Sequence, residues 1–189
     1  NLAQVVIGVR RSGKSTLCFN VLNKAEVKYA YVNFDDDRFS QIKISDLDNV
    51  LLILNKLYGD FKYLFMDEVQ NVEGWHLFVN RLQRRGIHII ITGSNAKLLS
   101  SELATHMTGR SSEIPLYPFS FKEYCEYFNV DTTSKTTAKK ASRLALFDEY
   151  LKVGGFPELL EDKNNPTYIK NLVMLGIVQK ESQTNHMIL

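Results

Sequence analysis

The segment Gly8–Ser15 (GVRRSGKS) has the residue types and the spacing of a phosphate-binding loop, G-x-x-x-x-G-K-S. Gly8 and Gly13 allow the backbone to turn so that successive N–H groups converge and form an anion nest. A helix that begins near Lys14 would direct the positive end of its dipole to the same point. We therefore expect Lys14 to bind the β- and γ-phosphates of a nucleoside triphosphate, and Ser15 to bind Mg²⁺. The other loop residues expected to line the nucleotide are Arg11, Ser12 and Thr16.

Two adjacent acids, Asp67 and Glu68, follow the apolar run Tyr63–Met66 (YLFM). In a parallel sheet that is buried on both faces, charge is tolerated at the carboxyl ends of the strands, where ligands bind. Because adjacent residues of a strand point to opposite sides, the two acids should have different roles. We expect Asp67 to hold Mg²⁺ beside Ser15, and Glu68 to orient and deprotonate the attacking water. The alternative is that the pair caps the next helix.

Polar residues also end the segment Ile91–Asn95 (ITGSN). If this strand lies between the first strand and the acidic strand, its end faces the γ-phosphate. We then expect Ser94 or Asn95 to sense the γ-phosphate and the attacking water, and we favour Ser94. An N-cap of a helix from Ala96 is the other interpretation, and one residue can serve both purposes.

Arg110 follows Gly109 just before the fifth apolar run. An arginine there could stabilise charge on the transferred phosphoryl group, in its own subunit or in a neighbouring one. A surface salt bridge is an equal alternative.

The remaining charged residues near these motifs favour simpler interpretations. Arg10 or Arg11 could contact phosphate, but we expect at least one of them to face solvent. Asp35–Asp37 is expected to form a solvated turn rather than a metal contact. The histidines lack ligand spacing, and His88 alternates with apolar residues, which indicates a structural role.

Alternating strands and helices must position these residues. Short apolar runs predict five strands: Gln4–Gly8, Tyr29–Phe34, Tyr63–Asp67, Ile87–Thr92 and Ser112–Leu116. The last is expected at the sheet edge, because Pro115 cannot donate a ladder hydrogen bond. Helical patterns separate them: Lys14–Leu22, Ser45–Tyr58, Gly74–Arg84 and Ala96–Leu103. This alternation predicts an α/β sandwich with a parallel sheet.

The pattern changes after Tyr117. Helices are predicted over Ser120–Phe128, with a capping arrangement of Ser120 and Glu123, and over Ser142–Lys152 and Pro166–Lys180. The polar segment Asp131–Lys140 is expected to be an exposed loop, and Gly154–Pro157 to break the chain. We therefore expect two domains, a nucleotide-binding core over residues 1–118 and a small helical subdomain over 119–189 that is incomplete at its C-terminus.

Composition excludes several classes of function. The 189 residues are 44% hydrophobic, enough for one full core, and the net charge of +2 gives no argument for a nucleic-acid surface. No apolar run reaches membrane-spanning length. The two cysteines, Cys18 and Cys125, match no metal or redox spacing, so a reducing, cytoplasmic environment is expected.

The order of the motifs GVRRSGKST, DEVQ, TGSN, GR and GGFPE resembles that of the prokaryotic AAA-type ATPases, in the additional-strand, catalytic-glutamate division of P-loop NTPases. The resemblance runs from Leu2 to Leu160, and Thr108–Tyr124 and Gly154–Glu158 are its more specific parts. Val9 departs from the proline that is usual in this loop.

This resemblance implies the strand order 5-1-4-3-2, ATP as the nucleotide and a small helical lid. It also implies a role for Arg110 like that of the arginine before the fifth AAA strand, which would require a homo-oligomer if it acts on a neighbour. Members usually continue into a C-terminal domain that this sequence does not show. A nucleic-acid or protein partner is therefore expected to bind through that missing domain.

Three functions fit these motifs. The leading one is Mg-dependent ATP hydrolysis by Lys14, Ser15, Asp67, Glu68 and Ser94. The second is a slow nucleotide-gated switch whose output is partner binding or oligomerisation. A small-molecule kinase ranks last, because kinases usually lack an acid pair placed for water. GTP is not favoured, since no N/T-K-x-D segment is present.

Overall fold

The computed structural model describes residues 2–94 and 103–161. Its centre is a sheet of five strands in the order β2-β3-β4-β1-β5. All neighbouring strands pair in parallel. Read from β5, this is the order 5-1-4-3-2 that the family resemblance implies. The strands are β1 Ala3–Ile7, β2 Tyr29–Asn33, β3 Tyr63–Asp67, β4 His88–Gly93 and β5 Ser111–Pro115.

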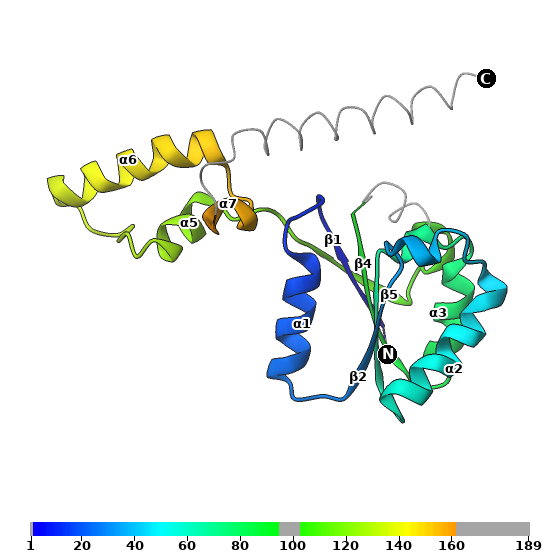
Figure 1. The fold of residues 1–189 in the computed structure, drawn as a ribbon. Helices are drawn as coiled ribbons and strands as arrows, with labels where there is room; N and C mark the ends of the chain where they lie inside the picture. The colour runs from blue at the N-terminus through cyan, green and yellow to red at the C-terminus, as the bar shows by residue number, and fades with distance from the viewer. Residues whose placement is uncertain (1, 95–102, 162–189) are drawn as a thin grey trace, which may run out of the picture. The chain divides into compact units, whose positions relative to one another are not determined.

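Helices cover both faces of the sheet, with α1 (Lys14–Lys24) on one face and α2 (Leu47–Tyr58) and α3 (Trp75–Arg84) on the other (Figure 1). Alternate strand residues therefore enter different cores. Val5 packs with the α2 and α3 residues, whereas its neighbour Val6 packs with α1. This is the predicted α/β sandwich. Each strand reads as a continuous apolar run because both of its faces are buried.

The predicted helices differ from the observed ones mainly at their ends. The segment expected as Ser45–Tyr58 starts as a short 3₁₀ turn, η2 (Ile44–Asp46), before α2. Leu47, Leu51 and Leu54 form the buried face of α2, whereas Leu57 near its end is 72% exposed. The helix predicted over Ala96–Leu103 falls almost entirely outside the described residues.

The chain divides into two compact units, Asn1–Tyr117 and Pro118–Leu189, one residue before the boundary expected from sequence. In the second unit, α5 (Phe121–Tyr127) starts with the expected capping box. The Ser120 N–H donates to Glu123 Oε2 at 2.8 Å, and the Glu123 N–H donates to Ser120 Oγ at 3.3 Å. These two bonds satisfy N–H groups that a helix start leaves without partners.

The loop predicted over Asp131–Lys140 is shorter than expected, because α6 spans Thr137–Val153. Lysine and alanine at positions 138–141 favour helix more strongly than the Thr/Ser-rich start of the segment does. The short helix α7 (Pro157–Glu161) begins with proline, which suits a first helical position. The helix predicted over Pro166–Lys180 lies outside the described residues.

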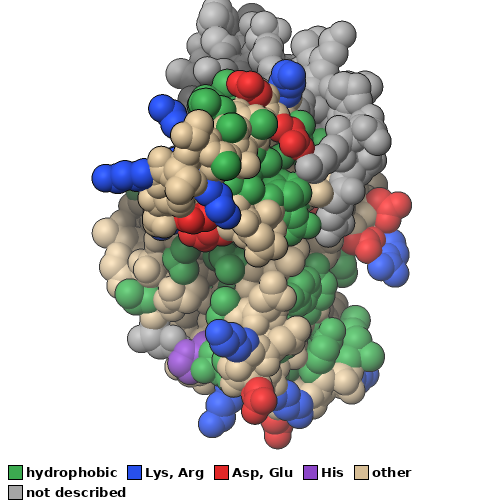
Figure 2. Space-filling model, turned by 90° about the vertical axis from the view of Figure 1, so that its left-hand side faces the viewer, with side chains coloured by type: hydrophobic (Ala, Val, Ile, Leu, Met, Phe, Trp, Pro, Cys, Tyr) green, Lys and Arg blue, Asp and Glu red, His purple; other side chains and the backbone are tan. Residues whose placement is uncertain are grey.

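Charged side chains of both signs are spread among apolar ones on the face that Figure 2 shows, and they form no single basic area there. This agrees with the net charge of +2. Within the described ranges, no helix has both the length and the apolar character needed to cross a bilayer.

Candidate nucleotide site

The glycine-rich loop joins β1 to α1 at the carboxyl end of the sheet. Gly8 must be glycine for steric reasons, because a Cβ atom there would lie 2.2 Å from the carbonyl oxygen of Leu116. Gly13 has a φ of +88° and sits at the start of α1, in a conformation that other residues rarely adopt. The backbone therefore curls tightly before the helix, as a phosphate-binding nest requires.

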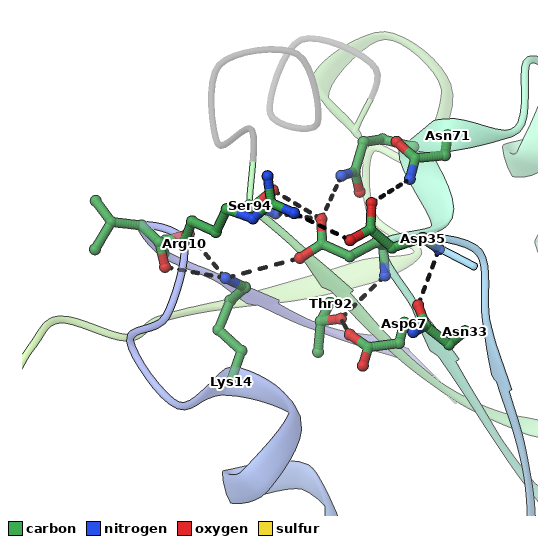
Figure 3. A network of polar contacts seen from close by, with 12 residues as sticks. Arg10, Lys14, Asn33, Asp35, Asp67, Asn71, Thr92 and Ser94 are labelled. Carbon is green, nitrogen blue, oxygen red and sulfur yellow. Dashed lines mark hydrogen bonds and ion pairs between the residues drawn. The ribbon is translucent and has the colours of Figure 1, made fainter. Parts of the chain in front are cut away.

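Lys14 lies inside this curl and is only 5% exposed. Its Nζ donates hydrogen bonds to the carbonyl oxygens of Gly8 at 3.2 Å and Val9 at 3.0 Å (Figure 3). Burial lowers the pKa of Lys14, and the nearby Glu68 and Asp67 carboxylates oppose that shift. The site thus holds a buried cation in a low-dielectric environment, where its attraction for anionic oxygens is stronger than in water and is partly offset by the two acids.

The other expected loop ligands surround Lys14 along the chain. Ser12 is buried, Ser15 is half-buried in the first turn of α1, and Thr16 is exposed. Arg11 is exposed and has a φ of +66°. These placements put the Ser15 hydroxyl at the helix start, where it could bind Mg²⁺.

Asp67 is the last residue of β3, and its carboxylate is buried. It accepts hydrogen bonds from the hydroxyl of Thr92 on β4 and from the hydroxyl of Tyr31 on β2, the latter at 3.3 Å. Burial and the Asp67 carboxylate raise the pKa of Tyr31, so the phenol stays protonated and donates. Strands on both sides of β3 therefore fix the orientation of this carboxylate.

Glu68 has already left the strand, since its φ of +52° is in the left-handed region. Strand alternation therefore does not explain how Asp67 and Glu68 are separated, and that expectation was wrong. The hydrogen-bond partners of the two carboxylates nevertheless differ. Oε2 of Glu68 accepts hydrogen bonds from the Ser94 N–H at 2.9 Å and from the Ser94 hydroxyl at 2.8 Å. Oε1 lies 3.9 Å from Lys14 Nζ. The Glu68 side chain makes no cap bond to the following turn, so the capping alternative does not hold.

The loop also contacts the segment that follows β2, through its residue Arg10. Arg10 forms an ion pair with Asp35 at 3.2 Å, and Asn71 donates to the other carboxylate oxygen of Asp35 at 3.4 Å (Figure 3). Both Arg10 and Asp35 are at least half exposed. Asp36 instead caps a 3₁₀ turn, η1 (Asp37–Phe39), and hydrogen bonds from Arg38 hold the pKa of Asp36 below its usual range. The predicted solvated turn thus describes Asp36, whereas Asp35 contacts the loop.

The described residues contain no group of three or more His, Cys, Asp or Glu side chains that could hold a metal by themselves. Mg²⁺ in nucleotide sites does not need such a group, because phosphate oxygens and waters complete its octahedral shell around one or two protein ligands. The buried Asp67 carboxylate and the Ser15 hydroxyl suit that limited requirement.

The sequence profile of the AAA domain matches residues 1–125, which include the loop, both acids, Ser94 and Arg110. The chain belongs to the AAA domain family. This confirms the resemblance inferred from the motifs and identifies a nucleotide-binding ATPase module.

Similar proteins include an uncharacterized protein of Methanocaldococcus jannaschii (MJ1544), 37% identical over 100% of this chain and 43% of its own length. Another is an uncharacterized protein of Haemophilus influenzae, 40% identical over 83% of this chain and 40% of its own length. The chain thus spans about two fifths of the length of these relatives.

Arg110 of this AAA domain lies away from the loop, at the opposite end of the sheet. Its carbonyl oxygen accepts the N–H of Ala3 at 2.9 Å, at the start of β1. The loop follows Ile7 at the other end of β1, about 13 Å further along at roughly 3.3 Å per residue. The expectation that Arg110 could stabilise the transferred phosphoryl group within its own subunit was therefore wrong. The guanidinium donates to Asn80 Oδ1 at 3.1 Å and has no acidic partner among the described residues.

Sequence reasoning assigned no role to three residues that shape the AAA site. Thr92 contacts both acids, Gln70 donates to Glu68 Oε2 at 2.6 Å, and Asn71 links Asp35 to the carbonyl of Phe34. The only available signal was position, since Thr92 lies near the end of its strand, two residues before Ser94, and Gln70 follows the acid pair. His88 lies in β4 and its ring stacks on Tyr63 at 4.7 Å, which supports the structural role expected for it.

Proposed function

We propose that this AAA domain binds ATP with Mg²⁺ and hydrolyses it. The observation that carries the proposal is the position of Glu68 Oε1, 3.9 Å from the phosphate-loop Lys14 Nζ. A carboxylate at this point can accept a proton from water, next to the group that would hold the γ-phosphate. A nucleotide-binding protein that only binds has no need of a base there.

Each residue has a separate part in this reaction. Lys14 would exchange its bonds to the Gly8 and Val9 carbonyls for bonds to the β- and γ-phosphates. The backbone N–H groups of the loop, together with Arg11, Ser12 and Thr16, would line the remaining phosphate oxygens. Asp67 and Ser15 would hold Mg²⁺, which when bound supplies positive charge that neutralises the phosphate oxygens. Glu68 would take the proton of the attacking water.

Ser94 contributes to the same chemistry through Glu68. Its N–H and hydroxyl both donate to the Glu68 carboxylate. Binding or loss of the γ-phosphate that moves Glu68 would therefore also move Ser94, which follows β4. This is a more indirect sensor than a direct phosphate contact.

The Glu68→Gln variant tests the proposal. It preserves size and hydrogen bonding but removes the base, so ATP binding should persist while turnover falls by about 10²-fold or more. Binding is measured with a fluorescent ATP analogue and turnover by phosphate release, with and without Mg²⁺. Unchanged turnover in this variant would refute the role of Glu68.

A nucleotide-gated switch is a second candidate, supported by the exposed Arg10–Asp35 ion pair between the loop and the end of β2. A bound nucleotide that attracts Arg10 would break its ion pair with Asp35. The turn η1, which follows Asp35, would then no longer be tied to the loop by that ion pair. Comparing the oligomeric state with ADP and with a non-hydrolysable ATP analogue distinguishes this candidate. Equal mass in both, together with fast hydrolysis, would exclude it.

The wider setting is also a proposal. Cys18 and Cys125 are both free and buried, which suits a reducing compartment, and we place this ATPase in the cytoplasm. We propose that hydrolysis is coupled to a protein or nucleic-acid partner through sequence of the kind that makes the relatives more than twice as long.

A further inference from the structure

The two oxygens of the Glu68 carboxylate have different environments. Oε2 accepts three hydrogen bonds, two from Ser94 at 2.9 and 2.8 Å and one from Gln70 Nε2 at 2.6 Å. Oε1 accepts none of these and faces Lys14 Nζ at 3.9 Å. A carboxylate oxygen has two lone pairs, so three donors saturate Oε2. Only Oε1 is left to take a proton from water.

Gln70 supplies the shortest of the three bonds. Its other amide atom, Oε1, is buried and has no hydrogen-bond partner among the described residues. A flipped amide would place this oxygen against the Glu68 carboxylate, where two acceptors repel each other. The glutamine is therefore held with its N–H₂ group toward Glu68, and its orientation follows from that one contact.

The backbone around Gln70 is firmly held. Gln70 is the middle residue of η3 (Val69–Asn71), in which Val69 is buried in the core. The Asn71 N–H donates to the carbonyl of Glu68 at 3.1 Å, and its side chain donates to the carbonyl of Phe34 at 3.2 Å. A rigid turn on one side and the end of β4 on the other thus grip the same carboxylate oxygen.

We propose that Gln70 is a positioning residue for Glu68, which with Ser94 fixes Oε2 so that Oε1 faces the phosphate-binding loop. This inference rests on the proposed hydrolysis. It adds a residue that acts through the Glu68 carboxylate.

The Gln70→Met variant tests it, because methionine has a similar shape but no donor. kcat should fall about tenfold, since the base is no longer held in a productive orientation. The affinity for a non-hydrolysable ATP analogue should not change, and neither should the midpoint of thermal unfolding. Gln41→Met is the matched control, an exposed glutamine with no hydrogen bond to the site, and it should leave kcat unchanged.

A double-mutant cycle separates positioning from a general structural effect. If Gln70 acts only through the Glu68 carboxylate, Gln70→Met should lower kcat in the wild-type background but not in the Glu68→Gln background. A tenfold fall in both backgrounds would overturn the proposal, as would an unchanged kcat in the single variant.

Amide hydrogen exchange of Ser94 gives a readout that does not need hydrolysis. Loosening of the carboxylate in Gln70→Met should speed exchange of the Ser94 N–H about fivefold, and Gln41→Met should not. If the wild type fails to hydrolyse ATP, the proposed function is wrong, and exchange still decides whether Gln70 holds Glu68. Unchanged exchange would refute that contact.

Discussion

Thr92 and Asp67 are hydrogen-bonded across the carboxyl ends of β4 and β3, with the threonine hydroxyl as donor. The same hydroxyl oxygen accepts the N–H of Glu68 at 3.2 Å. The ladder between the two strands pairs Met66 with Ile91, so this contact continues the register by one residue. One buried hydroxyl therefore fixes the side chain of the first acid and the backbone of the second.

Replacing Thr92 by valine removes this hydroxyl while keeping the shape of the side chain. It removes one of the two hydroxyl donors of the buried Asp67 carboxylate and the acceptor of the Glu68 N–H, and such losses cost about 1.5–3 kcal/mol when one group is charged. We expect the free energy of unfolding to fall by about 2–3 kcal/mol in urea denaturation. Thr92→Ser retains the hydroxyl and should lose less. A valine variant as stable as the wild type would contradict the role of this bond.

Gly8→Ala should damage the nucleotide site directly. The added Cβ would lie 2.2 Å from the backbone oxygen of Leu116, whose N–H is itself bonded to Ile7 at 2.7 Å, so neither strand can yield cheaply. We expect loss of nucleotide binding and a cost of about 1–3 kcal/mol in stability. Binding is measured by titration with a fluorescent ATP analogue.

Gly86→Ala is the matched control for this variant. Gly86 also has a positive φ, of +82°, but a Cβ there would meet nothing within 4 Å. Its cost should be the left-handed strain alone, about 1–2 kcal/mol, with nucleotide affinity unchanged. Equal affinities for the two alanine variants would show that the contact with Leu116 does not shape the loop.

The phosphate loop and the sheet could be predicted because their physical causes are local. Glycine spacing determines the turn before α1, and apolar runs mark strands that are buried on both faces. The strand order, in contrast, came from the family resemblance. Side-chain periodicity says nothing about which buried strands are neighbours.

The polar contacts within the site could not be predicted in the same way. The contacts of Glu68 depend on a φ of +52°, which a residue other than glycine rarely adopts, and strand alternation therefore gave the wrong geometry. Thr92 reads as an ordinary strand residue, since β-branched side chains favour sheets. The position of Arg110 at the far end of β1 required the register of β5 on β1.

Arg110 can contribute to hydrolysis only from a neighbouring subunit, given its position beside Asn80 and Ala3. We expect Arg110→Ala to retain ATP affinity but to lose about 10²-fold or more in kcat if it acts in this way. Mixing this variant with Glu68→Gln should then restore part of the activity, because one variant supplies the base and the other the arginine. If Arg110→Ala alone keeps full activity, and the mixture shows no recovery, Arg110 has a purely structural role.

Cys18 gives a prediction for alkaline pH. Burial raises the pKa of its thiol from 9.0 to about 12, and the Asp67 carboxylate adds to the shift. The folded state therefore favours the neutral thiol, whereas the unfolded chain ionises it near pH 9. The free energy of unfolding keeps the full contribution of the neutral thiol below pH 9 and loses it as the pH rises toward 12. Thiol alkylation at pH 8 should be slow in the native protein and fast in urea. The free energy of unfolding should fall less steeply above pH 9 in Cys18→Ala than in the wild type, and parallel curves would contradict this assignment.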